Sequence, residues 1–276
     1  MNEQVKKTAI DCVKQGGAIL LDYHRNLQSL QVQSKGHSDY VTEADLTVQE
    51  ALVRLIRQHH PEHDILAEEE KEAPRRNATR WIIDPLDGTT NFIHGFPVFA
   101  ISIAVEHDGC MHLGAVYDPS RDELFLAEKG RGATLNGQPL RVSTRNEPSQ
   151  ALIATGFPWR EKALLASYLK VFSRIFTQVS DLRRTGSAAL DLAYVASSRC
   201  DGFWEVGLKP WDIAAGHLLV QEAGGRVTDF TGGEKHIWIG DVIAGNPAMH
   251  ELLLGVIQDV FGGNISSSPQ GNQQHQ

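Results

Sequence analysis

Residues 84–88, Asp-Pro-Leu-Asp-Gly, carry two carboxylates three residues apart, directly after an apolar stretch. The proline and the glycine make the chain turn, so both carboxylates and the Leu86 carbonyl can converge on one point. Hard cations such as Mg²⁺ prefer such a set of oxygen ligands. Thr89 and Thr90 then begin a turn or helix whose free N–H groups could hold a phosphate. The alternative is a plain turn with a threonine cap.

Three other acidic positions could join this pair of carboxylates. Glu68 is the first acid after a short apolar stretch and is well placed to point back into a cleft, whereas Glu70 in the same run is expected to be solvated. Asp212 stands at the start of an expected helix, where it could cap the helix, bind a metal, or do both. Asp45 also precedes an expected helix. Besides capping, it could orient a threonine hydroxyl or a water for attack, provided that a metal lowers the pKa of the water.

Two further segments could line a substrate pocket. Residues 183–188, Arg-Arg-Thr-Gly-Ser-Ala, join an expected strand to an expected helix and place Ser187 at the helix start, which suits a hydroxyl-rich or anionic ligand. Glu205 ends a strand seven residues before Asp212 and could accept hydrogen bonds from substrate hydroxyls. The alternatives are a capped helix and a salt bridge at the rim. The two arginines could also lie on an exposed rim and bind a protein partner.

Several common functional patterns do not occur in the sequence. It contains no GxxxxGK[ST] phosphate loop, no GxGxxG after a strand, no GxSxG and no HExxH. The 12 histidines show no convincing ligand spacing. The three cysteines, Cys12, Cys110 and Cys200, are far apart, which argues against a disulfide framework or a zinc site.

Charge and hydropathy restrict the partners and the compartment. The 276 residues include 34 acids and 26 lysines and arginines, a net charge of −8. Such a chain is not expected to bind nucleic acid through non-specific phosphate contacts, but bound cations could reverse the local sign and admit an anionic substrate. No run approaches the roughly 18 apolar residues of a membrane helix, and the N-terminus does not resemble a signal peptide. We therefore expect a cytoplasmic protein without membrane contact.

The elements that position these residues change in character along the chain. In the first half, apolar spacing predicts helices at 5–23 and after Asp45, strands at 63–67 and 80–84, and an antiparallel meander over 96–140. In the second half, helices and strands alternate, which predicts a largely parallel sheet covered by helices. The expected strands are 152–155, 179–183, 202–205, 226–229 and 242–244, and the expected helices are 162–176, 187–197, 212–223 and 247–260.

This change predicts two lobes. Residues 1–147 would form an α+β lobe with the antiparallel sheet and most metal ligands. Residues 148–262 would form an α/β lobe with Asp212 and the polyol contacts. Residues 263–276, rich in Gly, Ser, Asn and Gln, are expected to be a disordered tail.

Together these motifs closely resemble the inositol monophosphatase family. Residues 81–92 (WIIDPLDGTTNF) and 210–216 (PWDIAAG) match its two signatures, in order and at about the right separation. Residues 68–69 (EE) and 41–45 (VTEAD) add to the match, which runs to about residue 260. Residues 183–196 and 222–233 are similar to the bacterial inositol-1-monophosphatase branch of extragenic-suppressor type.

The resemblance implies a fold and a reaction. The fold would be the five-layer αβαβα sandwich of the inositol monophosphatase and sugar phosphatase type, of mixed α+β and α/β class. The reaction would be Mg²⁺-dependent release of phosphate from myo-inositol 1-phosphate by direct attack of a metal-activated water, with no covalent phospho-enzyme. Family members commonly form homodimers and are inhibited by lithium.

The resemblance also implies roles for individual residues. One metal would be held by Glu68, Asp84 and the Leu86 carbonyl, a second by Asp84, Asp87 and Asp212, and a third, weaker one would depend on Glu68. Thr89 and Asp45 would orient the nucleophilic water, so that Glu68, Thr89 and Asp45 form the catalytic set. The phosphate would contact Gly88, Thr89, Thr90 and Lys35. The polyol would contact Gly186, Ser187, Ala188, Glu205 and Asp212.

Two alternatives to this function stay open. The substrate could be another small phosphate ester: a nucleotide 3′-phosphate, fructose 1,6-bisphosphate or histidinol phosphate. Relatives with larger substrates generally carry insertions that this chain lacks, and Ser187 stands where animal members carry Thr, so polyol selectivity is open. The second alternative is a regulatory partner of the transcription or RNA-processing machinery, as some bacterial members are.

Overall fold

The computed structural model describes residues 2–36, 39–70 and 74–262. The predicted tail, 263–276, lies outside these residues and stays a prediction, as does the division into two lobes at residue 147. Among the described helices, none combines the length and the apolar character needed to cross a membrane.

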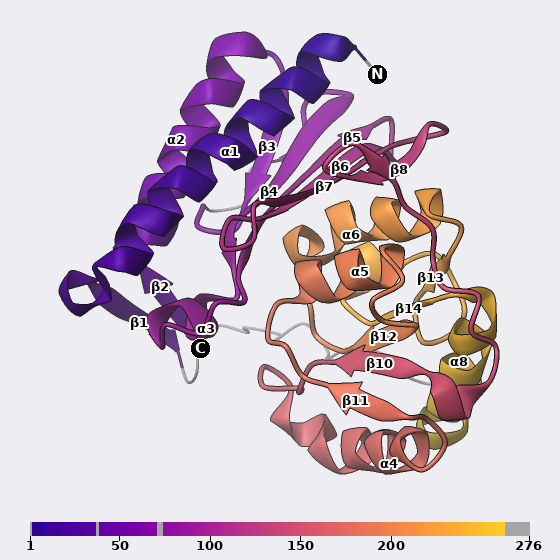
Figure 1. Cartoon of the computed structure of the whole chain (residues 1–276). Coiled ribbons are helices and arrows are strands. Elements are labelled where there is room, and N and C mark those ends of the chain that lie inside the picture. Colours follow the sequence, from indigo (N-terminus) through magenta and orange to yellow (C-terminus); the bar gives the residue numbers. More distant parts are fainter. Residues whose placement is uncertain (1, 37–38, 71–73, 263–276) are drawn as a thin grey trace, which may run out of the picture.

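Helices and sheets alternate in five layers (Figure 1). One outer layer consists of α1 (Glu3–Arg25) and α2 (Glu43–His59), the central layer of α5 (Ala188–Ala196) and α6 (Pro210–Glu222), and the other outer layer of α4 (Leu165–Phe176) and α8 (Pro247–Phe261). A seven-stranded sheet lies between the first two helix layers and a five-stranded sheet between the last two. The predicted αβαβα sandwich is confirmed.

The seven-stranded sheet is a meander with one added strand. Its order follows the chain: β3 (Asp64–Ala67), β4 (Thr79–Asp87), β5 (Ala100–His107), β6 (Cys110–Asp118), β7 (Glu123–Glu128), β8 (Gly132–Leu135) and β9 (Gln138–Pro139). β3 and β4 are parallel and all later neighbours are antiparallel, as the turn signals predicted. β4 is almost entirely buried because helices cover both faces of the sheet.

The five-stranded sheet has the order β11-β10-β12-β14-β13. Its strands are β10 (Leu152–Thr155), β11 (Asp181–Arg183), β12 (Gly202–Glu205), β13 (Arg226–Thr228) and β14 (Val242–Gly245). β10, β11, β12 and β13 all run in the same direction, and β14 alone runs antiparallel to its two neighbours. The prediction of a largely parallel sheet is therefore confirmed except for β14. The link from β13 to β14 contains only the four-residue helix α7 (His236–Ile239), which is too short to carry the chain back along the sheet.

Most other predicted elements are confirmed within a few residues, and the differences fall near the site. α2 begins three residues earlier than expected and α6 two residues earlier, so that Asp45 and Asp212 are the third residues of their helices. β4 extends to Asp87. The short helix α3 (Thr89–Ile93) begins where a turn or helix was predicted. The elements that were not predicted are a hairpin of β1 (Val32–Gly36) and β2 (Asp39–Thr42), the short helix α7, and the 3₁₀ turns Leu27–Ser29, Pro148–Gln150 and Lys162–Leu164.

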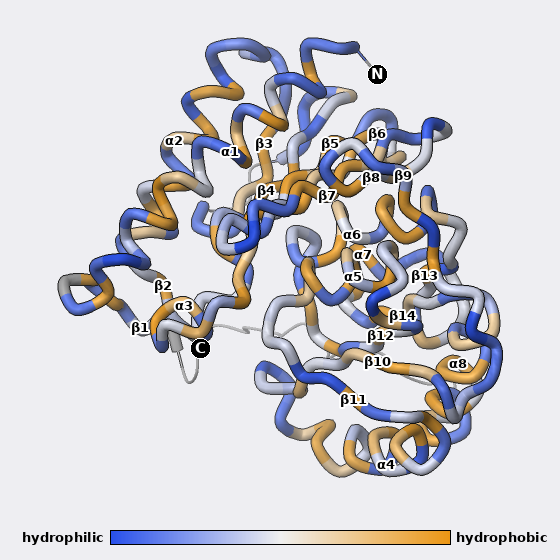
Figure 2. The backbone as a smooth tube through the Cα atoms, viewed as in Figure 1, coloured by the Kyte–Doolittle hydropathy of each residue, from blue (hydrophilic) through white to orange (hydrophobic). Residues whose placement is uncertain are grey.

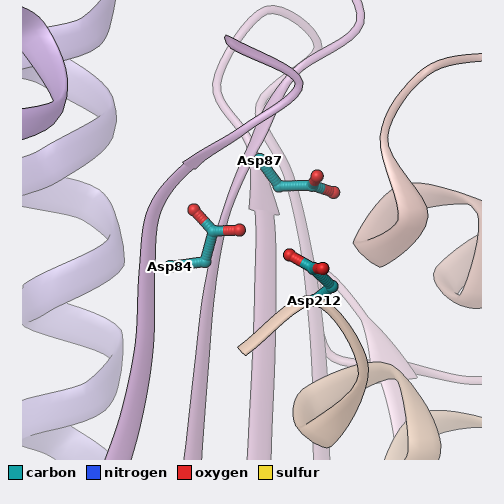
Figure 3. A group of neighbouring side chains, drawn as sticks. All are labelled: Asp84, Asp87 and Asp212. Atoms are coloured by element: carbon teal, nitrogen blue, oxygen red, sulfur yellow. The ribbon is translucent and has the colours of Figure 1, made fainter. Parts of the chain in front are cut away.

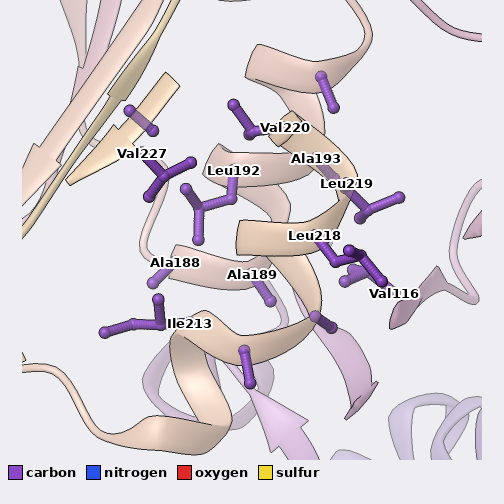
Figure 4. Close-up of a cluster of buried hydrophobic side chains, with 14 of the residues drawn as sticks. Val116, Ala188, Ala189, Leu192, Ala193, Ile213, Leu218, Leu219, Val220 and Val227 are labelled. Atoms are coloured by element: carbon purple, nitrogen blue, oxygen red, sulfur yellow. The ribbon is translucent and has the colours of Figure 1, made fainter. Parts of the chain in front are cut away.

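The central helices α5 and α6 are apolar on nearly all sides, which is typical of a helix buried between two layers. Figure 2 shows the apolar residues gathered in the strands and these inner helices, and Figure 4 shows their side chains interlocking. The backbone of α6 lies in close contact with β6 and α5. A Cβ added at Gly114 of β6 would lie 2.6 Å from the Ala215 carbonyl oxygen, and one added at Gly216 would lie 2.5 Å from Leu192 Cβ. This packing fixes the position of α6 and hence of its first turn.

The contact between β6 and α6 predicts the effect of a small substitution. Gly114→Ala places a methyl group against the backbone of α6, which cannot move as a flexible side chain would. We expect a loss of about 1–3 kcal/mol in the free energy of unfolding, measured by urea denaturation. Gly255→Ala is the matched control because its added Cβ meets nothing within 4 Å in the middle of α8. It should leave stability unchanged or raise it by up to about 1 kcal/mol. Equal stability of both variants would contradict the argument.

Candidate active site

Three carboxylates from two distant segments meet between the layers. Asp84 and Asp87 lie at the end of β4, and Asp212 lies in the first turn of α6. One carboxylate oxygen from each lies within 4.8 Å of those of the other two. Figure 3 shows the three side chains directed toward one another. Their exposed fractions are 1%, 9% and 6%, so the group is shielded from most solvent.

An irregularity in β4 places Asp84 and Asp87 on the same side. Residues three apart on a regular strand point to opposite faces. Here Asp84 pairs with Ser102 and Asp87 with Ala100, so three steps along β4 oppose two along β5. The extra residue forms a bulge, and the Leu86 N–H donates to Asp84 Oδ1 at 2.9 Å instead of joining the ladder. The Asp-Pro-Leu-Asp segment therefore turns both carboxylates toward α6.

Donors from other elements hold Asp87 and Asp212. Asp87 Oδ2 accepts hydrogen bonds from Ser187 Oγ at 2.6 Å and from the Ala189 N–H at 2.8 Å, both at the start of α5. Asp212 Oδ2 accepts from the Lys209 N–H at 2.7 Å, just before α6. Asp212 thus caps its helix from inside the first turn, and Lys209 occupies the cap position. In each case the bonds use one oxygen and leave the other to face the cluster.

Asp45 connects the start of α2 to Thr89. The cap of α2 is Thr42, so Asp45 does not precede the helix as expected. Asp45 Oδ2 accepts hydrogen bonds from the backbone N–H and the hydroxyl of Thr42. Thr89 Oγ1 lies 3.3 Å from Asp45 Oδ1 and 3.0 Å from the Leu86 carbonyl oxygen. Asp45 therefore both caps its helix and orients the Thr89 hydroxyl.

A cavity of about 580 Å³ opens onto the three carboxylates. Most of the predicted site residues line it: Glu68, Asp84, Leu86, Asp87, Gly88, Thr89, Thr90, Gly186, Ala188, Glu205 and Asp212. Asp45 and Ser187 do not line it but bond to Thr89 and Asp87, which do. The backbone of Lys35 lies in β1, and its side chain is outside the described part of the structure. The chain thus gathers residues separated by more than 100 positions around one cavity.

The match with known proteins covers nearly the whole chain. A family model described as the inositol monophosphatase family matches residues 1–261. The chain belongs to this family. It is similar to the protein named Nus factor SuhB from Escherichia coli (strain K12), with 44% identity over 252 residues, 91% of this chain and 94% of that protein. These similarities agree with a phosphatase of the inositol monophosphatase family.

Two solved structures of this family have the same fold. The extragenic suppressor protein suhB from Bartonella henselae has a TM-score of 0.89 and 42% identity, over 92% of this chain and 98% of that one. The inositol monophosphatase from Anabaena (Nostoc) sp. PCC 7120 has a TM-score of 0.83 and 37% identity, over 94% of this chain and 97% of that one.

Burial and mutual repulsion make the acid cluster costly to ionise. The pKa of Asp84 is raised well above its usual value by burial, then by the charges of Glu68, Asp87 and Asp212. The pKa of Asp87 is raised to about 7, mainly by burial and then by Asp212. Burial also raises the pKa of Asp212, against which Arg160 acts as the main countercharge, with Nη1 3.9 Å from Asp212 Oδ2. Burial raises the pKa of Asp45 to about 6. A cation in this place would remove the repulsion.

Glycines make room where side chains would clash. Gly88 has a φ of +94°, and a Cβ there would lie 2.9 Å from the Val98 carbonyl oxygen, so the turn after Asp87 requires glycine. A Cβ at Gly156 would lie within 2.2 Å of the Glu205 carboxylate. Glu205 therefore occupies space that only a glycine at position 156 leaves open, and no sequence motif marked this glycine.

Several lining residues were missed or misplaced by sequence reasoning. Residues 183–188 were predicted to line a pocket or, for the two arginines, to form an exposed rim; Arg184 lines the cavity, whereas Arg183 forms an ion pair with Asp181. Missed altogether were Asn91, Gly156, Trp159, Arg160 and Asp191. Asp191, one helical turn after Ser187, could have been suspected from spacing. Arg160 follows no recognisable motif.

The raised pKa values predict how the metal-free protein responds to pH. A carboxyl group whose pKa is higher in the folded than in the unfolded state stabilises the fold at low pH, and this contribution is lost as the pH rises. For Asp87 this contribution to stability is lost between about pH 4, near the ordinary pKa of an aspartate, and about pH 7, the raised pKa in the folded protein. Asp84→Asn removes one charge from the same cluster, so in the presence of a chelator its melting temperature should exceed that of the wild type by at least ~2 °C at pH 8. The difference should shrink toward pH 4. A lower melting temperature for the variant at pH 8 would contradict this account.

Proposed function

We propose that the protein is a Mg²⁺-dependent phosphatase for small phosphate monoesters, with myo-inositol 1-phosphate as the leading substrate. The observation that carries this proposal is the group of three buried carboxylates within 4.8 Å of one another, facing a cavity of about 580 Å³. Family membership supports the reaction class, and the Anabaena relative named an inositol monophosphatase supports the substrate.

The donor set fits hard divalent cations. It consists of oxygen atoms alone, and its carboxylates are too close together and too buried to be stable as bare anions. In our proposal Glu68, Asp84 and the Leu86 carbonyl hold one Mg²⁺, Asp84, Asp87 and Asp212 hold a second, and Glu68 contributes to a weaker third. When bound, these ions would activate water and neutralise the charge that develops on the phosphate and the leaving oxygen.

The residues around Thr89 would orient the attacking water. The Thr89 hydroxyl stands between Asp45 Oδ1 and the Leu86 carbonyl oxygen, so its hydrogen and its lone pairs have fixed directions. Asp45 is fully buried and held by Thr42, which keeps this arrangement rigid. Asp45 and Thr89 would therefore accept a proton or hydrogen bond from the water, and Glu68, which follows β3 beside Asp84, would complete the catalytic set.

The phosphate and the alcohol would occupy different walls. The backbone N–H groups of Gly88, Thr89 and Thr90 would bind the phosphate, with Lys35 nearby. On the other wall Glu205 and Asp212 would accept hydrogen bonds from hydroxyl groups, beside the backbone of Gly186 and Ala188. Ser187 would affect the site indirectly, by holding Asp87 in place, because its buried hydroxyl donates a hydrogen bond to that carboxylate.

Substitution of the carboxylates tests this proposal. Asp84→Asn and Asp212→Asn should each lower phosphate release from inositol 1-phosphate in Mg²⁺ by a factor of about 10³ or more, since each removes a metal ligand without removing volume. Glu70→Gln is the matched control, because it removes one acidic charge from an exposed side chain beside the site. It should change kcat/KM by less than about twofold. Near wild-type turnover in either aspartate variant would refute the assignment.

Two further features belong to the proposal. Inhibition by Li⁺ follows from the expected site for the second metal ion. A homodimer is supported by exposed apolar side chains on α4, Leu165, Leu169 and Phe176, and light scattering would measure the oligomeric state.

A substrate panel that also holds a nucleotide 3′-phosphate, fructose 1,6-bisphosphate and histidinol phosphate would rank the alternative substrates by kcat/KM.

We also propose a second role, as a protein partner of the transcription or RNA-processing machinery. The supporting observation is the name of the Escherichia coli relative, a Nus factor, at 44% identity. Affinity-tagged wild-type protein and Asp84→Asn should then retain equal amounts of RNA polymerase, because binding would not need catalysis. An unrelated tagged protein is the control. If neither form retains more polymerase than the control, this second role is excluded.

A further inference from the structure

We propose that Gly240 and Asp241 are positioning residues of the active site, because they hold the short chain segment that leads to Asp212. This inference rests on the proposed function and adds two residues to it. Neither is among the described residues that line the cavity. Their influence on a bound metal ion would therefore pass through the backbone of the segment that they hold.

The segment in question consists of residues 206–209, which join the end of β12 to the start of α6. Glu205 precedes it, and Asp212 follows it by three residues, so it connects two acids of the cavity. Its last residue, Lys209, donates its N–H to Asp212 Oδ2 at 2.7 Å, and its Leu208 lines the cavity. The four residues belong to neither a helix nor a strand, so contacts from other elements must fix their course.

Gly240, which directly follows α7, packs against the backbone of segment 206–209. The Leu208 N–H donates to the Gly240 carbonyl oxygen at 3.0 Å. Gly240 has a φ of +84°, and an added Cβ would lie 2.3 Å from the Leu208 carbonyl oxygen. A residue with a side chain could not approach the segment this closely in this conformation.

The side chain of Asp241 makes a second contact with the same segment. Its carboxylate accepts a hydrogen bond from the Gly207 N–H. The side chain is buried, and its Oδ2 has no hydrogen-bond partner within the part of the chain that the structure describes. Burial raises the pKa of Asp241 to about 6, and the negative charges of Asp229 and Glu161 act in the same direction. Such a carboxylate costs stability, and what it holds in place is segment 206–209.

The residues on either side of this pair are themselves anchored. In α7, which lies against α6 (Figure 2), His236 Nε2 lies 2.7 Å from His217 Nδ1 of α6. Val242, the next residue along the chain, pairs with Glu205 at the start of β14. The pair is therefore fixed from both ends, so it can restrain the segment.

Two substitutions of Asp241 separate the effect of its hydrogen bond from the effect of its charge. Asp241→Leu keeps a side chain of similar shape but removes the acceptor, whereas Asp241→Asn removes the charge and keeps an acceptor for the Gly207 N–H. Loss of a residue that orients a metal ligand typically lowers metal affinity by about 10–100-fold. We expect the Mg²⁺ dissociation constant to rise by about tenfold or more in Asp241→Leu and by less than about twofold in Asp241→Asn.

The dissociation constant is measured without turnover, from the rise of the melting temperature with Mg²⁺ concentration after a chelator has removed bound metal. Gly240→Ala is an independent second variant, because its methyl group displaces Leu208 without removing a hydrogen-bond acceptor. It should raise the dissociation constant by about tenfold as well. If Asp241→Leu does not fold, Gly240→Ala decides alone.

Ile56→Ala is the control for a general loss of stability. Ile56 is fully buried in α2, in an apolar cluster that contains no residue of segment 206–209. Its truncation should lower the melting temperature without changing the Mg²⁺ dissociation constant.

The outcomes separate this inference from the proposed function. Wild-type Mg²⁺ affinity in both Asp241→Leu and Gly240→Ala would overturn the positioning role and leave the proposed function standing, as would an equal loss of affinity in Ile56→Ala. A loss in Asp241→Asn as large as that in Asp241→Leu would overturn the role of the hydrogen bond. A wild-type protein whose melting temperature does not respond to Mg²⁺ would overturn both proposals.

Discussion

Asp84, Asp87 and Asp212 bring like charges within 4.8 Å of one another in surroundings that exclude most solvent. Such a group is unfavourable in a folded chain unless donors and cations offset it. The protein supplies donors from separate layers: the start of α5 for Asp87, the start of α6 for Asp212, and the backbone of the β4 bulge for Asp84. These hydrogen bonds hold the carboxylates in place, in the arrangement of oxygen atoms that the proposed divalent cations would use.

The position of α6 links this site to the whole sandwich. α6 lies between the two sheets, and its contact with β6 is close enough that only glycine fits at residue 114. Since Asp212 sits in the first turn of α6, packing far from the cavity determines where this carboxylate lies. The large apolar cluster around α5 and α6 therefore contributes to the geometry of the carboxylate group as well as to stability.

The lining of the cavity carries charges of both signs. The end of β4 and the start of α6 contribute acidic residues, whereas Arg160 and Arg184, which follow β10 and β11, line the cavity together with Glu205 and Asp191. The net charge of −8 argued against anionic partners, but the distribution around the cavity changes that conclusion. Four of the acids, Glu68, Asp84, Asp87 and Asp212, line one place where bound cations would reverse the sign. An anionic substrate is then compatible with an acidic protein.

The sequence by itself determined the residue types at the site and the elements that carry them. The motifs around Asp84 and Asp212, the helices and the meander were predictable because they depend on local spacing and on short motifs, whereas the five layers were implied by the family resemblance. The hydrogen-bond partners of the site carboxylates could not be predicted, because they are distant in the chain: Ser187 lies 100 residues from Asp87.

Only the tertiary structure decided the features that depend on contacts between layers. These are the antiparallel direction of β14, the place of Glu205 against Gly156, and the entry of Arg160 and Arg184 into the cavity. No local sequence pattern distinguishes an arginine that lines a cavity from one on the surface. The difference depends on where neighbouring strands end and on which aromatic rings pack against the side chain. The acidic residues of the site thus stand in short sequence motifs, whereas the rest of the cavity lining depends on tertiary packing.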